Sequence, residues 1–168
     1  MMMSLHSLEI FLQPGTYYFA GRDSRICTVL GSCVSMTFWH PRLLVGGMCH
    51  YLLPERAGTG GRSVPDGRYA DEAIVLLLKK MDVVGASYKE YQVKLFGGGN
   101  MFPEMPKKNS QSLIGIKNVH AAQRLTKQYG FTCVAEHLGG VGYRRVMFDV
   151  WSGEVWVKHT HVLPVAKY

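Results

Sequence analysis

The sequence predicts an α/β sandwich with a largely antiparallel or mixed sheet. Short apolar runs rich in β-branched and aromatic residues are typical of strands, and two segments repeat apolar residues with helical spacing. Their order is several strands, a helix, a strand, a helix and more strands, which favours this class. With 168 residues, 47% of them hydrophobic and 18% charged, we expect residues 1–168 to form a single domain with a substantial core.

The first third of the chain is expected to contribute strands. Residues 8–12 form an apolar patch typical of an edge strand or arm, and residues 26–30 form a short strand that runs into Gly31. Two further apolar runs, residues 34–39 and 43–48, are separated by His40-Pro41-Arg42. Proline is favoured at the second position of a type I turn, so the chain is predicted to reverse there and form a hairpin.

The register of this hairpin decides whether two reactive side chains meet. A hairpin symmetric about the Pro41–Arg42 bond would place Cys33 directly opposite His50. Directly opposite residues of an antiparallel pair share a face, with Cβ atoms about 4.5–5.5 Å apart. A slip of one residue would send the two side chains to opposite faces.

The middle of the chain predicts a loop, a helix and a strand. Residues 54–67 are rich in glycine and proline, and this loop begins close enough to His50 to cover it. Residues 69–81 repeat apolar residues at the spacing of a helix, and Gly85 ends the region. Residues 91–96 are predicted as a strand, followed by a glycine-rich turn and a polar loop at residues 103–112.

The last third predicts a second helix and three strands. The helix is expected over residues 117–129, with Gly130 as its C-terminal stop. Strands are expected over residues 131–136, 145–151 and 154–158. Ser152-Gly153 suits a tight hairpin turn between the last two strands.

Composition narrows the function class. The formal net charge of +7 favours an acidic partner, but the basic residues are dispersed in isolated pairs, which argues against nucleic-acid binding. The chain contains no apolar run long enough to span a bilayer and no signal-peptide pattern, so we expect a soluble, cytoplasmic protein. Its four cysteines show no CxxC spacing and are expected to be free thiols.

Cys33 and His50 are the candidate catalytic residues. A thiolate is a strong nucleophile, and a neighbouring histidine can take the thiol proton and later protonate a leaving group. Gly31 and Ser32 permit a tight backbone at the nucleophile. The competing interpretations are a buried structural cysteine and a histidine whose hydrogen bonds are satisfied within the core.

A third group is expected to orient the imidazole, and either Thr28 or Cys27 could supply it. The two are adjacent in a strand and point to opposite faces, so only one can serve. Metal binding by Cys33, Cys49 and His50 is not expected, because Cys49 and His50 point to opposite faces of one strand. Gly97-Gly98-Gly99 lacks the pattern of a phosphate-binding loop and is interpreted as a tight turn.

Six segments of the chain stand out together: TVLGSCV (28–34), VGGMCHYLLP (45–54), RYAD (68–71), FGGGNMF (96–102), IGIKN (114–118) and AEHLGG (135–140). In their order and over about residues 15–158, they resemble the CheD family, the chemoreceptor glutamine deamidases of bacterial chemotaxis. The resemblance implies a three-layer α/β sandwich, and the apolar periodicity described above predicts that it contains two main helices.

The same resemblance implies a cysteine hydrolase that converts selected receptor glutamines to glutamates without a cofactor. Cys33 falls on the family nucleophile and His50 on the family histidine. The family's third residue is a threonine, which the local motif places at Thr28 and the spacing in some members places at Cys27. The implied partners are the cytoplasmic domains of chemoreceptors, and a chemotaxis phosphatase of the CheC type is a further candidate.

Two other functions fit the same residues. The dyad could hydrolyse receptor glutamyl methyl esters, since its chemistry at the carbonyl would be the same. The chain could also be a regulatory module that binds receptors or a CheC-type phosphatase without turnover. Release of ammonia, release of methanol and binding alone distinguish the three.

Overall fold

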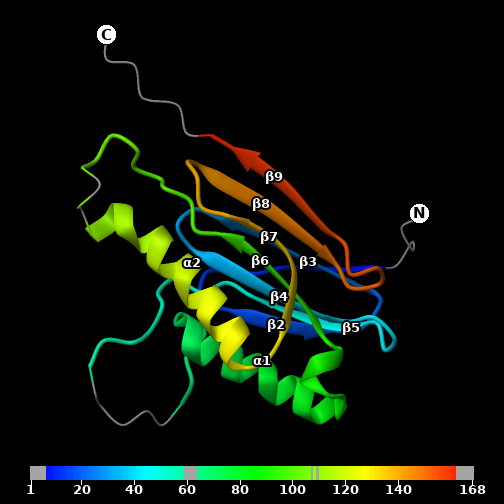
Figure 1. Cartoon of the computed structure of the whole chain (residues 1–168). Coiled ribbons are helices and arrows are strands. Elements are labelled where there is room, and N and C mark those ends of the chain that lie inside the picture. The colour runs from blue at the N-terminus through cyan, green and yellow to red at the C-terminus, as the bar shows by residue number, and fades with distance from the viewer. Residues whose placement is uncertain (1–6, 59–63, 107, 109, 162–168) are drawn as a thin grey trace.

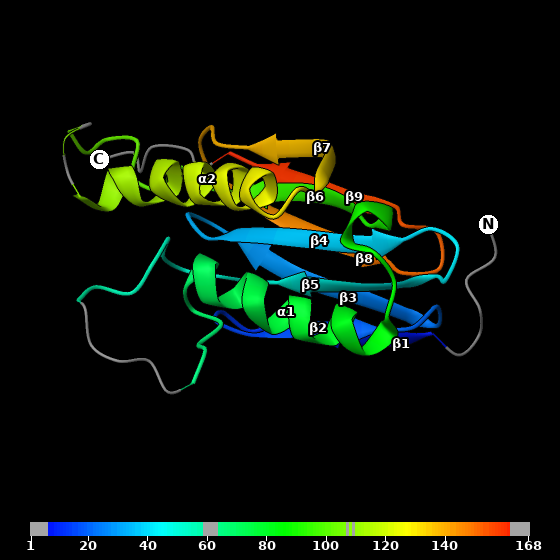
Figure 2. The same ribbon diagram turned by 60° about the horizontal axis from the view of Figure 1, so that its bottom comes forward.

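A computed structural model describes residues 7–58, 64–106, 108 and 110–161. This part of the chain forms three layers: two helices, a five-stranded sheet and a four-stranded sheet (Figures 1 and 2). The predicted α/β sandwich is therefore confirmed. Its strands divide between two packed sheets, which gives the molecule a helix-side core and an inter-sheet core.

The five-stranded sheet has the order β2 (Tyr17–Ala20), β5 (Val45–Cys49), β4 (Val34–His40), β6 (Gln92–Gly97) and β7 (Thr132–Leu138). The four-stranded sheet has the order β1 (Leu8–Phe11), β3 (Ser24–Leu30), β8 (Tyr143–Asp149) and β9 (Val155–Thr160). Neighbouring strands are antiparallel except for the parallel pairs β1–β3 and β6–β7. The mixed, largely antiparallel character is as predicted.

Both helices cover the same face of the five-stranded sheet (Figure 2). Helix α1 (Ala70–Val84) buries the predicted apolar stripe and ends at Gly85, whose φ of 80° is the left-handed conformation that glycine adopts without strain. A short 3₁₀ helix, η1 (Tyr88–Glu90), leads into β6.

Helix α2 (Ser110–Gln128) begins at Ser110 rather than at Lys117 as predicted. Residues 110–112 are polar and Gly115 has low helix propensity, so the stretch before Lys117 shows no helical repeat of apolar residues.

The predicted register of the β4–β5 hairpin is wrong. His40 pairs with Val45 and Trp39 with Gly46, so the turn covers residues 41–44 and is centred one residue later than Pro41–Arg42. Leu44 closes this turn with a left-handed φ of 52°, and its N–H donates to the His40 carbonyl at 2.9 Å. Cys33 is therefore not directly opposite His50.

The error amounts to two residues in pairing, which preserves the face. Val34 and Tyr51 form an isolated bridge in the same register as Thr37 and Met48, which places Ser35 opposite His50. Cys33 lies two residues before Ser35 and points to the same side. Diagonal neighbours of this kind lie about 7–8 Å apart, which is still within reach of longer side chains.

Strand alternation sorts the site residues into the inter-sheet layer. Ile26 and Leu30 of β3, together with Met48 of β5, belong to the core between the sheets. Thr28 lies two residues from each of the first two along β3, and His50 lies two residues after Met48. Residues spaced by two in a strand share a face, so Thr28 and His50 both face this layer. Cys49 belongs instead to the core beneath the helices.

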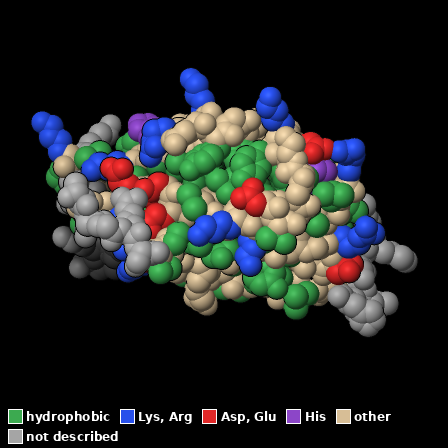
Figure 3. Space-filling view, turned by 90° about the horizontal axis from the view of Figure 1, so that it is seen from below, with side chains coloured by type: hydrophobic (Ala, Val, Ile, Leu, Met, Phe, Trp, Pro, Cys, Tyr) green, Lys and Arg blue, Asp and Glu red, His purple; other side chains and the backbone are tan. Residues whose placement is uncertain are grey.

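One outer face of the molecule carries its basic residues in the dispersed pattern that the sequence predicts. On the face seen in Figure 3, lysine and arginine side chains are scattered among acidic and apolar ones without forming a continuous stripe. Across the described ranges, neither helix combines the length and apolar character needed to cross a membrane.

Candidate active site

Cys33 lies in the turn between β3 and β4, at the edge of the inter-sheet core. Its side chain is partly exposed and packs against that core. Its carbonyl accepts a hydrogen bond from the Gly98 N–H at 2.8 Å, and the Gly31 carbonyl accepts one from Gly99 at 2.9 Å. The glycine-rich turn after β6 therefore holds the backbone on both sides of Ser32.

His50 follows β5 directly and is only 2% exposed. Its backbone is held by the segment that precedes β2: the His50 N–H donates to the Thr16 carbonyl at 3.0 Å, and its carbonyl accepts from Gly15 at 2.7 Å. Its ring crosses the inter-sheet layer, where Nδ1 lies 2.7 Å from Oγ1 of Thr28. This hydrogen bond joins one sheet to the other at the candidate site.

The Thr28 hydroxyl determines which imidazole nitrogen carries the proton. Thr28 Oγ1 also lies 2.9 Å from the Leu12 carbonyl, which can only accept. A hydroxyl has one proton, so Thr28 donates it to Leu12 and accepts from Nδ1–H of His50. This assignment from the hydrogen-bond network leaves Nε2 of His50 unprotonated and able to act as a base.

Cys27, the other candidate for the third residue, is turned away from His50. It occupies the alternate position on β3, where its backbone lies between Phe11 of β1 and Met147 of β8. Burial is the main cause that raises the pKa of its thiol, to about 11. Of the two residues that the sequence left open, Thr28 is the one that contacts the imidazole.

Cys33 and His50 face the same layer, but no hydrogen bond joins these two described side chains. Burial raises the pKa of the Cys33 thiol, while the N–H of Cys33 itself acts in the opposite direction. Burial lowers the pKa of His50 from 6.5 to about 4. Near neutral pH the pair is therefore a neutral thiol and a neutral imidazole, so the base is available before substrate binds.

The lowered pKa of His50 predicts an acid-sensitive contribution to stability. The unfolded chain binds this proton below about pH 6.5, whereas the folded protein resists it until about pH 4. The stabilisation is therefore complete above the unfolded pKa and is lost as the pH falls through this window. Between about pH 7.5 and about pH 4.5 we expect His50 to account for a loss of about 2–3 kcal/mol in the free energy of unfolding.

Urea unfolding of the wild type and of His50→Gln at the two pH values measures this contribution, because the variant cannot take up the proton. The other acidic and basic groups titrate in both proteins and cancel in the comparison. An equal loss of stability in both proteins would show that His50 is not the group responsible.

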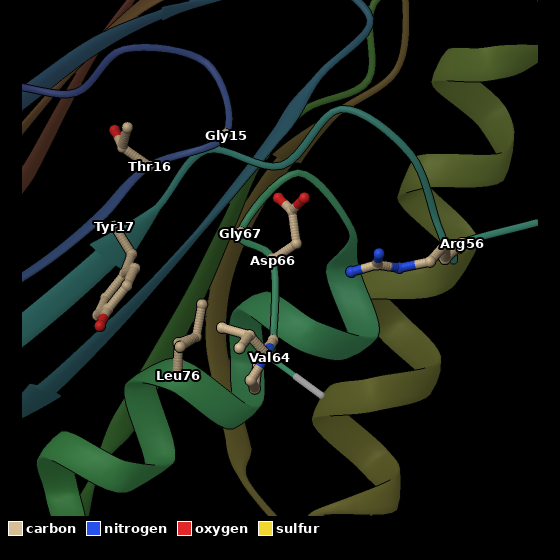
Figure 4. A pocket seen from close by; sticks show the side chains of 9 residues that line it. Gly15, Thr16, Tyr17, Arg56, Val64, Asp66, Gly67 and Leu76 are labelled. Atoms are coloured by element: carbon tan, nitrogen blue, oxygen red, sulfur yellow. The ribbon is translucent and has the colours of Figure 1, made fainter. Parts of the chain in front are cut away.

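An open pocket of about 670 Å³ lies against residues 15–17, which include the two residues that bond to the His50 backbone (Figure 4). Gly15 and Thr16 form one wall, and Tyr17 and Arg56 lie on opposite sides of it. Cys33, His50 and Thr28 are not among its lining residues. Residues 64–67 of the predicted loop line it too, whereas residues 59–63, which bear on whether the loop covers His50, lie outside the described residues.

One polar contact of the site was missed by reasoning from residue types. Asn118 of α2 is fully buried, and its Nδ2 lies 3.0 Å from the Ser32 carbonyl and 2.8 Å from the Leu52 carbonyl. The only sequence signal for it was its place in the segment IGIKN, because an asparagine on a helix does not by itself reveal a distant partner.

Taken together, the inter-sheet layer holds a thiol, an imidazole and a hydroxyl that orients the imidazole, an arrangement typical of cysteine-dependent hydrolases. The chain belongs to the CheD family. The family model, described as CheD chemotactic sensory transduction, matches residues 52–159. This match includes Asn118 and begins just after His50.

Curated relatives extend the similarity over Cys33 and His50. A protein of Pseudomonas fluorescens (strain SBW25) is 48% identical over 151 residues, which cover 90% of this chain and 84% of the relative. One of Pseudomonas syringae pv. tomato is 44% identical, covering 91% and 90% of the two chains. Both are named probable chemoreceptor glutamine deamidase CheD. A protein of Dechloromonas aromatica, named probable chemoreceptor glutamine deamidase CheD 3, is 46% identical, covering 89% and 86%.

Proposed function

We propose that this protein is a chemoreceptor glutamine deamidase in which Cys33 is the nucleophile, His50 the general base and acid, and Thr28 the residue that orients His50. The observation that carries the proposal is the 2.7 Å contact between Thr28 Oγ1 and His50 Nδ1, which leaves Nε2 of His50 unprotonated and able to act as a base. The substrate class comes from the names of relatives that are 44–48% identical to this chain.

The first half-reaction forms a thioester. Nε2 of His50 takes the thiol proton as Cys33 Sγ bonds to the side-chain carboxamide carbon of a receptor glutamine. Backbone N–H groups near Cys33 hold the developing oxyanion. His50 then gives the proton to the departing nitrogen, the carbon–nitrogen bond breaks and ammonia leaves.

The second half-reaction restores the enzyme. His50 takes a proton from water, and the resulting hydroxide attacks the thioester carbon. The carbon–sulfur bond breaks, Cys33 recovers a proton from His50, and the receptor carries a glutamate. Together the two half-reactions consume one water and release one ammonia. Cys33 and His50 supply the nucleophile and the proton transfers, so neither half-reaction draws on a metal or cofactor.

The domain, the location and the partners of the protein are proposed on the basis of this function. We propose that residues 1–168 act as one deamidase domain in the cytoplasm, where the signalling domains of chemoreceptors lie. A dispersed net charge of +7 suits an acidic helical receptor surface. A CheC-type phosphatase is a second proposed partner, since the family resemblance allows one.

Product analysis tests this function against its two alternatives. The purified protein is incubated with receptor cytoplasmic fragments that carry glutamine or glutamyl methyl ester at the modification sites. A deamidase releases ammonia from the first fragment in catalytic amounts. Methanol from the second fragment without ammonia from the first would identify an esterase, and tight binding without either product would identify a regulatory module.

A further inference from the structure

The Asn118 carboxamide spans the two segments that carry the candidate nucleophile and base. Ser32, whose carbonyl accepts from Nδ2 at 3.0 Å, is the residue directly before Cys33. Leu52, whose carbonyl accepts from the same nitrogen at 2.8 Å, lies two residues after His50. Carbonyl oxygens only accept, so the two contacts also determine which way the amide of Asn118 is turned.

A second set of contacts holds Asn118 and these segments together. The Tyr51 hydroxyl donates to the backbone carbonyl of Asn118, and Val34 and Tyr51 exchange backbone hydrogen bonds of 3.2 and 3.1 Å. Asn118 is fully buried, so its carboxamide makes these bonds without competition from water. Helix α2 is thus connected to the candidate site by the carboxamide and the backbone carbonyl of Asn118 rather than by apolar packing alone.

The hydrogen bond from Asn118 Nδ2 to the Ser32 carbonyl also sets the direction of the Cys33 N–H. In a trans peptide the C=O of one residue and the N–H of the next point in opposite directions. With Ser32 C=O turned toward Asn118, the Cys33 N–H points away from the helix. No backbone hydrogen bond in the described part of the chain uses this N–H, and its effect on its own sulfur is to lower the pKa of the Cys33 thiol.

We infer that Asn118 is a positioning residue: its carboxamide orients the Ser32–Cys33 peptide so that the Cys33 N–H faces the reacting carbonyl, and it holds the Cys33 and His50 segments at a fixed separation. This role rests on the proposed deamidase function. Donors to an oxyanion act only when their direction is set beforehand, so a small rotation of this peptide affects the transition state more than substrate binding.

Two variants test the inference. Asn118→Ala removes both hydrogen bonds, and Asn118→Asp keeps the shape but replaces the donor with an oxygen that faces two carbonyls. We expect kcat for ammonia release to fall about 100-fold in each, with KM changed by less than about threefold. We also expect alkylation of Cys33 by iodoacetamide, followed by peptide mass spectrometry without substrate, to slow several-fold and to shift to higher pH.

Thr126→Ala is the matched control for packing. Thr126 is buried on the same helix, and within the described part of the chain its hydroxyl bonds only to the Ala122 carbonyl one turn earlier. This variant should lower the melting temperature while leaving kcat and the alkylation profile of Cys33 within about twofold of wild type.

Each outcome has a defined meaning. Folded Asn118 variants with a wild-type kcat, or with reduced kcat and an unchanged alkylation profile, would overturn the inference. Loss of the folded state in both variants, judged by circular dichroism, would make Asn118 a structural residue and overturn it too. An altered alkylation profile in a protein whose wild type releases no ammonia would instead separate failure of the deamidase function from failure of the positioning role.

Discussion

Cys33→Ala is expected to abolish ammonia release from a receptor fragment, with a loss of about four orders of magnitude or more. The reason is that alanine has no atom that can form the thioester, and His50 alone would have to activate water against an unactivated amide. The loss should appear in kcat, while binding of the fragment is kept, because the side chain is small and partly exposed. A coupled assay of ammonia over time gives the rate.

Cys49→Ala is the matched control for removal of a thiol. Cys49 is adjacent to His50 in sequence but lies in the core beneath the helices, and burial raises the pKa of its thiol to about 12. It should lose some thermal stability and keep its activity. A Cys33→Ala variant as active as Cys49→Ala would place the nucleophile elsewhere.

His50→Gln is expected to reduce kcat by about three orders of magnitude, the middle of the range for loss of a general acid–base. Glutamine keeps a polar side chain in the layer but cannot take the thiol proton or return it to the leaving nitrogen. The rate should be measured on the same receptor fragment with the fold checked by circular dichroism.

Thr28→Val provides the graded comparison. Valine keeps the branched shape but lacks the hydroxyl that accepts from Nδ1, so the base remains while its orientation and tautomer are no longer set. We expect a loss of about tenfold to 100-fold, well short of the His50 variant. If Thr28→Val has the wild-type rate, the contact with Nδ1 has no part in catalysis.

The architecture was largely predictable because it depends on local patterns. The apolar stripe of α1 and the glycines at positions 85 and 130 identify a helix and two helix ends, and these signals act over a few residues. The order of strands and helices then limits the fold to few arrangements. The division of strands between two sheets was not predictable in this way, since pairing between distant strands leaves no local pattern.

The register of the β4–β5 hairpin could not be predicted from local signals, but the error in register kept Cys33 and His50 on the same face. Pro41 indicates a turn but does not specify its length, and a left-handed Leu44 is uncommon enough that no sequence rule would propose it. The resulting change in pairing is even, so Cys33 still faces the same side as His50.

The contacts of Thr28 and Asn118 had to come from the structure. Thr28 reaches His50 from the other sheet, and Asn118 reaches Ser32 from a helix 86 residues further along the chain. Side chains that meet only through tertiary packing are invisible to periodicity, spacing and turn chemistry. Residue types suggested the chemistry of the site, and the fold supplied the groups that orient it.

Site-resolved mass spectrometry of a chemoreceptor cytoplasmic fragment shows whether Cys33 is the nucleophile of a glutamine deamidase. The fragment is incubated in heavy-oxygen water with wild type or with Cys33→Ala, digested, and read glutamine by glutamine. We expect wild type to convert a small set of glutamines to glutamates that each carry one heavy oxygen, and Cys33→Ala to leave them unchanged. Equal conversion by the two proteins, or none by wild type, would contradict this assignment.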